Sequence, residues 1–122
     1  MQLHLAESAQ EVASCEERTG LTPAQLLSCH RVFGVRTTAA GCAALSQEDR
    51  KLLGKHGVTA VTTPVANAKA GMDVLAAAEC VRDGMNVALG TGGAIECGNL
   101  DLFEVMRAVA FAARQAAGDA AA

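Results

Sequence analysis

The sequence predicts an α/β fold in which four parallel strands alternate with helices. Short runs of small, apolar or β-branched residues are each followed by a helical pattern, and no two such runs are consecutive. Glycines mark the ends of most predicted elements. This alternation predicts a single parallel sheet whose strands are joined by right-handed crossovers.

The first unit begins with a strand from Gln2 to Ala6. Ser8 is followed three residues later by Glu11, a spacing that predicts a capping box and a helix that ends at Gly20. Pro23 then predicts a second helix, because proline is favoured at the first helical position. Two helices should therefore follow the first strand.

The second and third units are shorter. A strand of small residues is expected from Thr37 to Ala43, and Ser46 is the predicted N-cap of a helix that reaches Gly57. The β-branched run from Val58 to Thr63 predicts the third strand. The segment from Pro64 to Gly71 is expected to be a loop.

The last unit ends in a long amphipathic helix. A helix from Asp73 to Arg82 should stop at Gly84, before a buried strand from Asn86 to Gly90. Asp101, with Glu104 three residues on, predicts the cap of the final helix. Apolar residues at spacings of three and four place one stripe on that helix, namely Leu102, Phe103, Met106, Val109, Ala110 and Ala113.

A chain of 122 residues is long enough for one hydrophobic core. We expect a single domain over residues 1–118 and a frayed alanine-rich tail over residues 119–122. Hydrophobic residues make up 51% of the chain but aromatic residues only 2%, so Ala, Val, Leu and Met must build the core. Such a core buries less area per residue and predicts modest stability.

Charge and cysteine content exclude several classes of function. A net charge of -3 without a basic stripe does not favour binding to nucleic acid or to an anionic membrane. No apolar run reaches the roughly 20 residues that a membrane span requires. The five cysteines are scattered and form no C-x-x-C pair, which is typical of reduced thiols and predicts a cytoplasmic protein.

Two motifs carry a resemblance to a known family. The segment that starts NVALGT, continues with GA and ends in LDLFEVMR is similar to the eighth β/α unit of the amidohydrolase superfamily, and QLHLAES resembles its fifth strand. Within that superfamily, the sequence is most similar to the branch of chlorohydrolases and deaminases that act on S-adenosylhomocysteine and purine-like rings. The resemblance implies that the chain corresponds to the fifth to eighth units of a TIM (β/α)₈ barrel, which is half of that fold.

The resemblance also implies roles for particular residues. His4 matches a histidine that binds the catalytic metal, and Glu7 matches a glutamate that contacts the substrate ring. Four other polar positions of the family's active site are changed in this sequence. Two histidines of the sixth unit, one of the seventh and the aspartate of the eighth are replaced by Gly41, Ala44, Thr62 and Gly92.

Ligand number decides what these replacements mean. A catalytic zinc needs about three protein ligands and an open position, and His4 is the single histidine predicted at an inner strand end. We therefore expect no cofactor and no catalytic residue, and interpret the chain as a degenerate or engineered half-barrel without activity of its own. An alternative is a metal-dependent aminohydrolase half that acquires zinc or iron when a partner supplies the first four units. In that alternative His4 and Glu7 would be its contribution to the site.

A third hypothesis concerns the glycine turn formed by Gly90, Thr91, Gly92 and Gly93. Glycine-rich loops between a parallel strand and a helix expose backbone N–H groups and can bind phosphate or another anion. The motif is incomplete, because the third glycine of a G-x-G-x-x-G pattern would fall at Ile95 and a Walker lysine is missing. A simple turn explains the glycines equally well.

The remaining candidates have structural interpretations. His30 and His56 lie near predicted helix ends, where a cation favours the helix dipole. Cys42 is expected to be a buried thiol on the helix-covered face of the sheet. Cys97 falls in a predicted loop, without a neighbouring histidine to activate it as a nucleophile.

The predicted sheet suggests self-association. Four parallel strands in sequential order leave two open edges, formed by Gln2 to Ala6 and by Asn86 to Gly90. Replacement of the polar ligands also predicts an apolar inner face. We therefore expect a homodimer or a higher oligomer in which the first strand of one copy pairs with the fourth strand of another.

Overall fold

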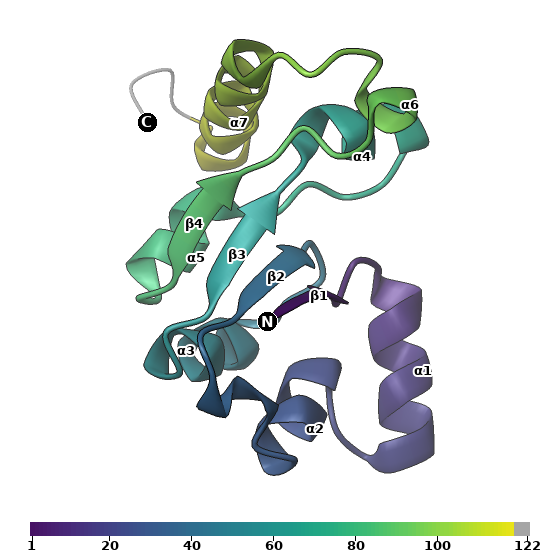
Figure 1. The fold of residues 1–122 in the computed structure, drawn as a ribbon, viewed down its shortest axis with the longest axis vertical. Coiled ribbons are helices and arrows are strands. Elements are labelled where there is room, and N and C mark those ends of the chain that lie inside the picture. The colour runs from purple at the N-terminus through teal and green to yellow at the C-terminus, as the bar shows by residue number, and fades with distance from the viewer. Residues whose placement is uncertain (119–122) are drawn as a thin grey trace.

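The computed structural model describes residues 1–118, so the predicted frayed end at residues 119–122 lies outside the described residues. Four parallel strands form one sheet in the order β1-β2-β3-β4 (Figure 1), which confirms the predicted topology. The strands are β1 (Gln2–Leu5), β2 (Thr38–Gly41), β3 (Thr59–Thr62) and β4 (Asn86–Leu89). The helices are α1 (Ala9–Thr19), α2 (Pro23–Cys29), η1 (Val32–Gly34), α3 (Gln47–Lys55), α4 (Pro64–Ala70), α5 (Ala77–Arg82), α6 (Ala94–Cys97) and α7 (Leu102–Ala117).

The two faces of the sheet differ. Side chains alternate between faces along a strand, so Leu5 and Ala39 point to the helix-covered side while His4 and Ala40 point to the other side. The helix-covered side holds the hydrophobic core, which is built mainly from alanine, valine, leucine and cysteine. Phe33 is its single buried aromatic side chain among residues 1–118. The expected small-residue core is therefore present.

The inner face of the sheet is mixed in character, whereas the sequence predicted an apolar one. Asn86 donates a hydrogen bond from its side-chain amide to Thr59 Oγ1 at 3.0 Å across two strands of this face. Gln2 and His4 are exposed on β1, and Val61 supplies apolar surface in the middle. Ala40 and Val61 supply the expected apolar character, and polar residues along the strands add to it.

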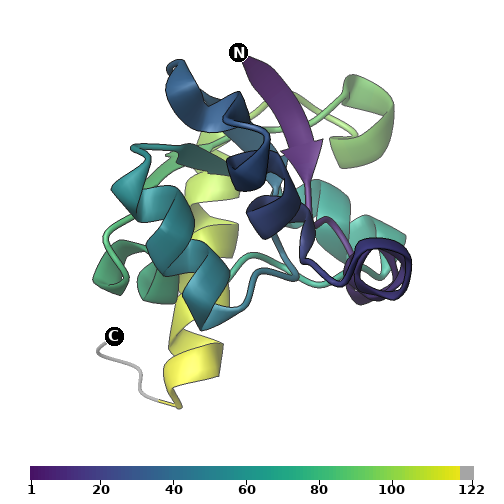
Figure 2. The ribbon, with the colours of Figure 1, turned by 90° about the horizontal axis from the view of Figure 1, so that it is seen from below.

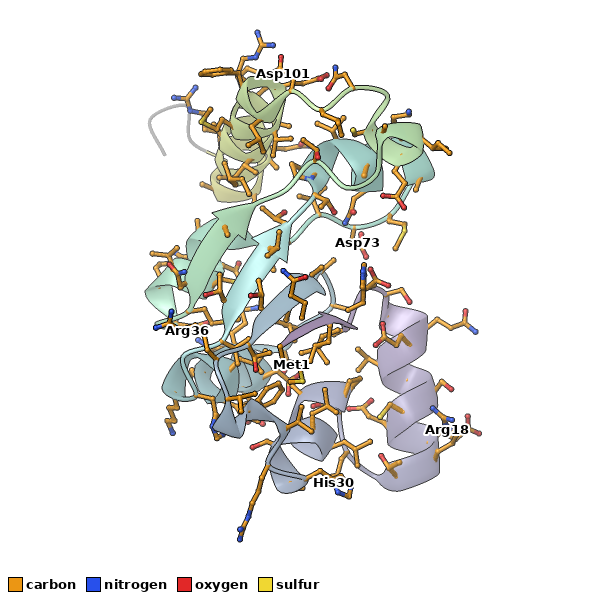
Figure 3. The ribbon with its side chains drawn as sticks, viewed as in Figure 1. Met1, Arg18, His30, Arg36, Asp73 and Asp101 are labelled. Carbon is orange, nitrogen blue, oxygen red and sulfur yellow. The ribbon has the colours of Figure 1, made fainter. Side chains whose placement is uncertain are left out.

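The start of the chain is held against the sheet. The α-amino group of Met1 donates to the carbonyl oxygen of Arg36 at 2.7 Å, and the backbone N–H of Thr38 donates to the carbonyl oxygen of Met1 at 2.9 Å. These bonds extend the pairing of β1 with β2 by one residue. Figure 3 labels Met1 and Arg36 on the ribbon. Figure 2 shows that β1 begins on the opposite side of the molecule from the end of α7.

The predicted helix starts are largely confirmed. Ser8 accepts a hydrogen bond from the N–H of Glu11, and Ser46 caps α3 in a complete capping box with Asp49. The carboxylate of Glu11 does not complete the box at Ser8. It accepts instead from the N–H groups of Ala6 and Glu7, at 3.0 and 2.8 Å, and so braces the loop that leaves β1.

Two segments between β3 and β4 differ from the prediction. The expected loop from Pro64 to Gly71 is the helix α4, because Pro64 presets the first helical turn and alanines follow it. The helix expected from Asp73 begins only at Ala77. In the segment that joins α4 to α5, the side-chain amide of Asn67 donates to the carbonyl oxygen of Asp73 at 2.6 Å.

The last unit contains one short additional helix. The segment expected as a loop before the final helix includes α6, which ends at Cys97, and α7 then begins after its N-cap Asp101. The side chain of Asp101 accepts from the N–H of Phe103, while Glu104 binds the side-chain amide of Asn99. None of the helices within residues 1–118 combines the length and apolar character required to cross a membrane.

Candidate functional site

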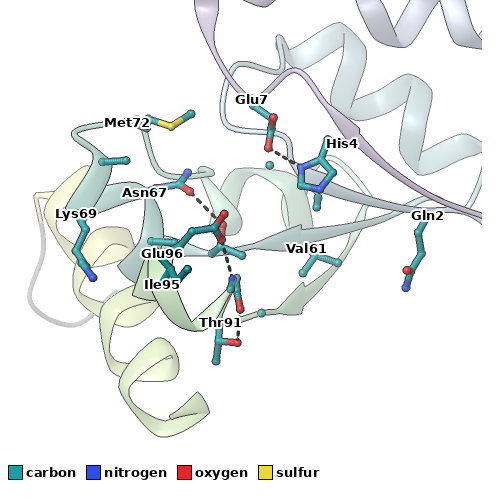
Figure 4. A pocket seen from close by; sticks show the side chains of 18 residues that line it. Gln2, His4, Glu7, Val61, Asn67, Lys69, Met72, Thr91, Ile95 and Glu96 are labelled. Atoms are coloured by element: carbon teal, nitrogen blue, oxygen red, sulfur yellow. Dashed lines mark hydrogen bonds and ion pairs between the residues drawn. The ribbon is translucent and has the colours of Figure 1, made fainter. Parts of the chain in front are cut away.

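A pocket of about 940 Å³ lies at the carboxyl ends of the strands (Figure 4). Ligand sites of parallel α/β sheets form at this end, because the loops that follow successive strands meet there. Its walls include His4 and Glu7 from the first unit and the turn from Gly90 to Gly93 from the last. The structure thus brings every residue of the predicted sites into one pocket.

His4 and Glu7 form an ion pair at the mouth of this pocket. His4 Nδ1 lies 2.7 Å from Glu7 Oε1, and the two side chains are 73% and 41% exposed. The hydrogen bond to Glu7 and the charge of its carboxylate raise the pKa of His4 above its ordinary value of 6.5. Because Glu11 accepts from the N–H of Glu7, the loop that carries Glu7 is anchored to the start of α1.

Gly41, where the family resemblance places a histidine, lies directly against Glu7. Its φ is +87°, and a Cβ placed there would lie 2.5 Å from Cγ of Glu7. The neighbouring Cys42 and Ala6 also have positive φ values, of 58° and 48°, although neither is glycine. Strained backbone of this kind is typical of functional sites and persists only where surrounding contacts enforce it. Here one such contact is a hydrogen bond from the N–H of Ala44 to the carbonyl oxygen of Ala6 at 2.9 Å.

The end of β3 presents Thr63 to the pocket, and not Thr62. Thr62 faces the helix-covered side like Ala60, is 1% exposed, and its hydroxyl has no hydrogen-bond partner among the described residues. Thr63 lines the pocket and donates from Oγ1 to Asn67 Oδ1 at 3.0 Å. A side chain at position 62 therefore does not reach the pocket in this conformation.

The glycine turn is closed by an acidic side chain. The N–H of Gly93 donates to Glu96 Oε2 at 2.7 Å, and a Cβ at Gly92, where φ is +73°, would lie 2.8 Å from the same oxygen. Glu96 therefore occupies the position at which an anion would meet this N–H group. Thr91 directs its hydroxyl to the carbonyl oxygen of Gly92 at 3.0 Å.

Glu96 is the pocket residue that sequence reasoning missed. It lines the pocket, and its negative charge contributes to the raised pKa of His4. Glu96 accepts from the N–H of the residue three positions before it, as the glutamate of a capping box does, but Gly93 has no side chain to complete the motif. The sequence therefore carried only a weak signal for this residue. Lys69 also lines the pocket and adds a positive charge.

A catalytic zinc or iron does not fit the side chains of residues 1–118 by themselves. Within this part of the chain, no group of three or more His, Cys, Asp or Glu side chains is placed to hold a metal ion. The His4–Glu7 pair has one feature of a metal ligand, because ligating histidines commonly donate their second ring N–H to a carboxylate. One imidazole supplies a single ligand, whereas catalytic zinc sites use about three.

The buried cysteines are poor candidates for chemistry. Burial raises the pKa of Cys42 to about 12 and that of Cys80 to about 11, so both thiols stay protonated near neutral pH. The expectation that Cys42 is buried on the helix-covered face is confirmed. The prediction that Cys97 lies in a loop was wrong. Cys97 is the last residue of α6 and is buried, and its thiol is directed to the carbonyl oxygen of Asn99.

His56 and His30 lie outside the pocket. The ring of His56 is within hydrogen-bond distance of Ser28 Oγ, at 3.1 Å, and packs 5.7 Å from the ring of Phe33. It is the C-cap of α3, and His30 is the C-cap of α2.

Comparison with known sequences identifies related proteins. The model of the Amidohydrolase family matches residues 1–122. A 5'-deoxyadenosine deaminase from Methanospirillum hungatei is 39% identical over 108 residues, which is 88% of this chain and 24% of the relative. A 5-methylthioadenosine/S-adenosylhomocysteine deaminase from Acetivibrio thermocellus is 32% identical over 108 residues, again 88% of this chain and 25% of the relative. The chain therefore spans about a quarter of the length of the curated relatives it matches.

Solved structures agree in fold. An adenosine deaminase from Xanthomonas campestris with bound zinc superposes with a TM-score of 0.86 at 32% identity, and the match covers 99% of this chain and 28% of that one. A guanine deaminase from C. acetobutylicum has a TM-score of 0.85 at 24% identity, with 98% of this chain and 30% of that chain covered. The four β/α units thus correspond to part of a larger barrel.

Proposed function

The chain belongs to the amidohydrolase family, and from this premise we propose that it is a section of a deaminase-type barrel with no hydrolytic activity of its own. The observation that carries the proposal is the state of Gly41 and Gly92. At both positions the backbone has a positive φ, and a carboxylate side chain fills the space into which a ligand side chain would start. At positions 41 and 92, the backbone conformation as well as the residue type therefore disfavours a ligand side chain.

The side chains that fill these spaces are themselves held in place. Glu7 is bound by His4, and Glu96 is bound by the N–H of Gly93. A ligand side chain at either glycine would displace the neighbouring glutamate and would have to adopt a positive φ. This supports a site adapted to the absence of the ligands.

A second candidate function keeps the chemistry of the family. His4 Nε2 points away from Glu7, and its ring is largely exposed to the pocket, so another barrel section could bring further ligands to it. A metal held in that way would polarise and activate water for deamination. This chain would then contribute His4 as a metal ligand and Glu7 as a contact to the substrate ring.

Anion binding by the glycine turn has less support. Glu96 already accepts the hydrogen bond of Gly93, and two carboxylates face the pocket against Lys69 and His4. The field inside the pocket therefore does not favour a phosphate.

Metal content and ammonia release test the proposal. The purified chain is dialysed against zinc, passed through a mild chelator, analysed for metal and then incubated with 5'-deoxyadenosine and 5-methylthioadenosine. We expect far less than one metal per chain and no ammonia above the rate of a heat-denatured control.

Two further results separate the candidates. Stoichiometric zinc or sustained ammonia release from the isolated chain would contradict the proposal. If ammonia appears only after addition of the separately produced first section of the Methanospirillum deaminase, and is lost in His4→Ala, the second candidate is correct. The variant Glu7→Ala then tests the contact to the substrate ring, because at saturating zinc it should still raise KM, whereas a loss of zinc affinity reports its hydrogen bond to His4.

A further inference from the structure

The loop that leaves β1 turns through a strained backbone conformation. Ala6 has a φ of 48°, in the left-handed region that a residue with a Cβ rarely adopts, and it is 1% exposed. Such a conformation persists only where surrounding contacts enforce it. The backbone N–H of a buried residue also needs an acceptor, because water does not reach it. The contacts of this turn therefore decide where the next residue, Glu7, is directed.

One carboxylate binds both residues of the turn. Glu11 accepts from the N–H of Ala6 through Oε1 at 3.0 Å and from the N–H of Glu7 through Oε2 at 2.8 Å. In an ordinary capping box the glutamate binds the N–H of the N-cap residue, which here is Ser8. Glu11 instead reaches the two residues before the cap. Hydrogen bonds to a charged acceptor are strong, so this carboxylate fixes the direction of two consecutive N–H groups.

The turn is held from two sides. Glu11 lies in the first turn of the 11-residue helix α1, and its own N–H donates to Ser8 Oγ at 3.2 Å. On the other side of the loop, the carbonyl oxygen of Ala6 accepts from the N–H of Ala44 at 2.9 Å. The left-handed turn is thus fixed between the start of α1 and the segment that follows β2.

The direction of Glu7 decides two features of the pocket. Its Oε1 lies 2.7 Å from His4 Nδ1, and its Cγ lies 2.5 Å from the point at which a Cβ on Gly41 would start. Glu7 follows Ala6 directly, so the turn at Ala6 sets the direction in which the Glu7 side chain leaves the backbone. Glu11 itself does not line the pocket, and its influence on these two contacts passes through Glu7.

We propose that Glu11 is a positioning residue for the pocket, because its carboxylate holds the turn that directs Glu7 toward His4 and into the space beside Gly41. Without this carboxylate the N–H of Ala6 loses its acceptor, the turn relaxes to an ordinary backbone conformation and Glu7 leaves the pocket wall. A helix residue outside the pocket thus controls which charged group the pocket presents. The inference concerns the loop alone, so zinc binding or ammonia release would contradict the proposed function and leave this inference standing.

NMR spectroscopy of the 122-residue chain tests the proposal. In Glu11→Ala, amide exchange at Ala6 should accelerate about tenfold or more, because the turn opens locally. The nuclear Overhauser effect between the ring of His4 and the γ-protons of Glu7 should be lost. The matched control is Asp49→Ala, which removes a buried capping carboxylate from α3 and does not touch this loop. Its Overhauser effect between His4 and Glu7 should persist.

A double-mutant cycle gives a second readout that a general loss of stability would not produce. Gly41→Ala places a Cβ against Glu7. Its effect on the unfolding equilibrium constant should be about threefold or more smaller in the Glu11→Ala background, because Glu7 then moves aside. In the Asp49→Ala background the effect should be unchanged.

Two results would overturn the proposal. One is a persistent Overhauser effect between His4 and Glu7 in folded Glu11→Ala, and the other is additivity of Glu11→Ala with Gly41→Ala. If Glu11→Ala does not fold, Glu11→Gln decides by the same two measurements, because its amide keeps one acceptor oxygen and opposes the second N–H with a donor.

Discussion

Gly41 and Glu7 share one small space at the carboxyl end of the sheet, where a Cβ on the glycine would lie 2.5 Å from Cγ of the glutamate. The relationship explains why the ion pair of His4 with Glu7 can form at all. The glutamate folds into the volume that a side chain at position 41 would need. A side chain at position 41 and the observed position of Glu7 therefore exclude one another.

Gly41→His should destabilise the chain by about 2–4 kcal/mol, because it combines a left-handed backbone with overpacking against Glu7. Chemical denaturation measures the loss. Gly20→His is the matched control, since Gly20 has a φ of +73° but a Cβ at that position would meet no neighbouring atom within 4 Å. Its cost should be about 1–2 kcal/mol. Equal losses at the two positions would argue against the steric account, as would a failure of Glu7→Ala to relieve part of the cost of Gly41→His.

Gly92→Asp should not create a zinc site. The aspartate would add one oxygen ligand to His4, which still leaves fewer than the roughly three ligands that a catalytic zinc requires. The Cβ of the aspartate would also lie 2.8 Å from Glu96 Oε2, and the residue would have to adopt a positive φ. Calorimetric titration with zinc should show no micromolar binding, both for Gly92→Asp and for Gly92→Asp combined with Glu96→Ala. Tight binding by either variant, with ammonia release, would show that the ligand count is wrong.

Glu7→Gln should lower the pKa of His4 toward its ordinary value of 6.5, because the variant removes the charge that stabilises the imidazolium. The native pKa is raised, so the stabilisation by this pair is complete below pH 6.5 and is lost as pH rises through the folded-state pKa. Glu7→Gln should therefore destabilise the chain more at acidic than at alkaline pH. Histidine resonances followed by NMR across pH give the value, with His56 as an internal control outside the pocket. An unchanged His4 titration would contradict the contact.

Asp49→Ala should cost about 2–3 kcal/mol of folding free energy. The carboxylate is 2% exposed, accepts from Thr22 Oγ1 at 2.6 Å and completes the capping box with Ser46. Its removal would leave a buried hydroxyl without a partner and uncap α3. Glu48→Ala, at the exposed neighbouring position in the same turn, should change stability by less than about 0.5 kcal/mol. Similar losses for the two variants would show that the buried link to Thr22 contributes nothing.

Local patterns determined most of the fold. The alternation of short strands with capped helices predicted four parallel strands in sequential order, and the structure has that order. Ser46 and Asp101 predicted helix starts because a capping side chain binds backbone only two or three residues away. These interactions can be predicted from the sequence because the two partners are only a few residues apart. The family was likewise recognisable from QLHLAES and LDLFEVMR, and the comparisons confirm it.

Tertiary structure decided the features that depend on residues distant in sequence or on the direction of the backbone. The alanine-rich segment Pro64–Ala70 forms a helix, and the next helix begins only at Ala77. The direction of Thr62 away from the pocket follows from the register of β3 within the sheet, which a single strand does not reveal. Glu7 and Glu96 reach the spaces beside Gly41 and Gly92 because the fold sets a positive φ at those glycines. The sequence by itself located Gly41 and Gly92 as positions where the family resemblance implies ligands, and only the packed chain determined that Glu7 and Glu96 lie against them.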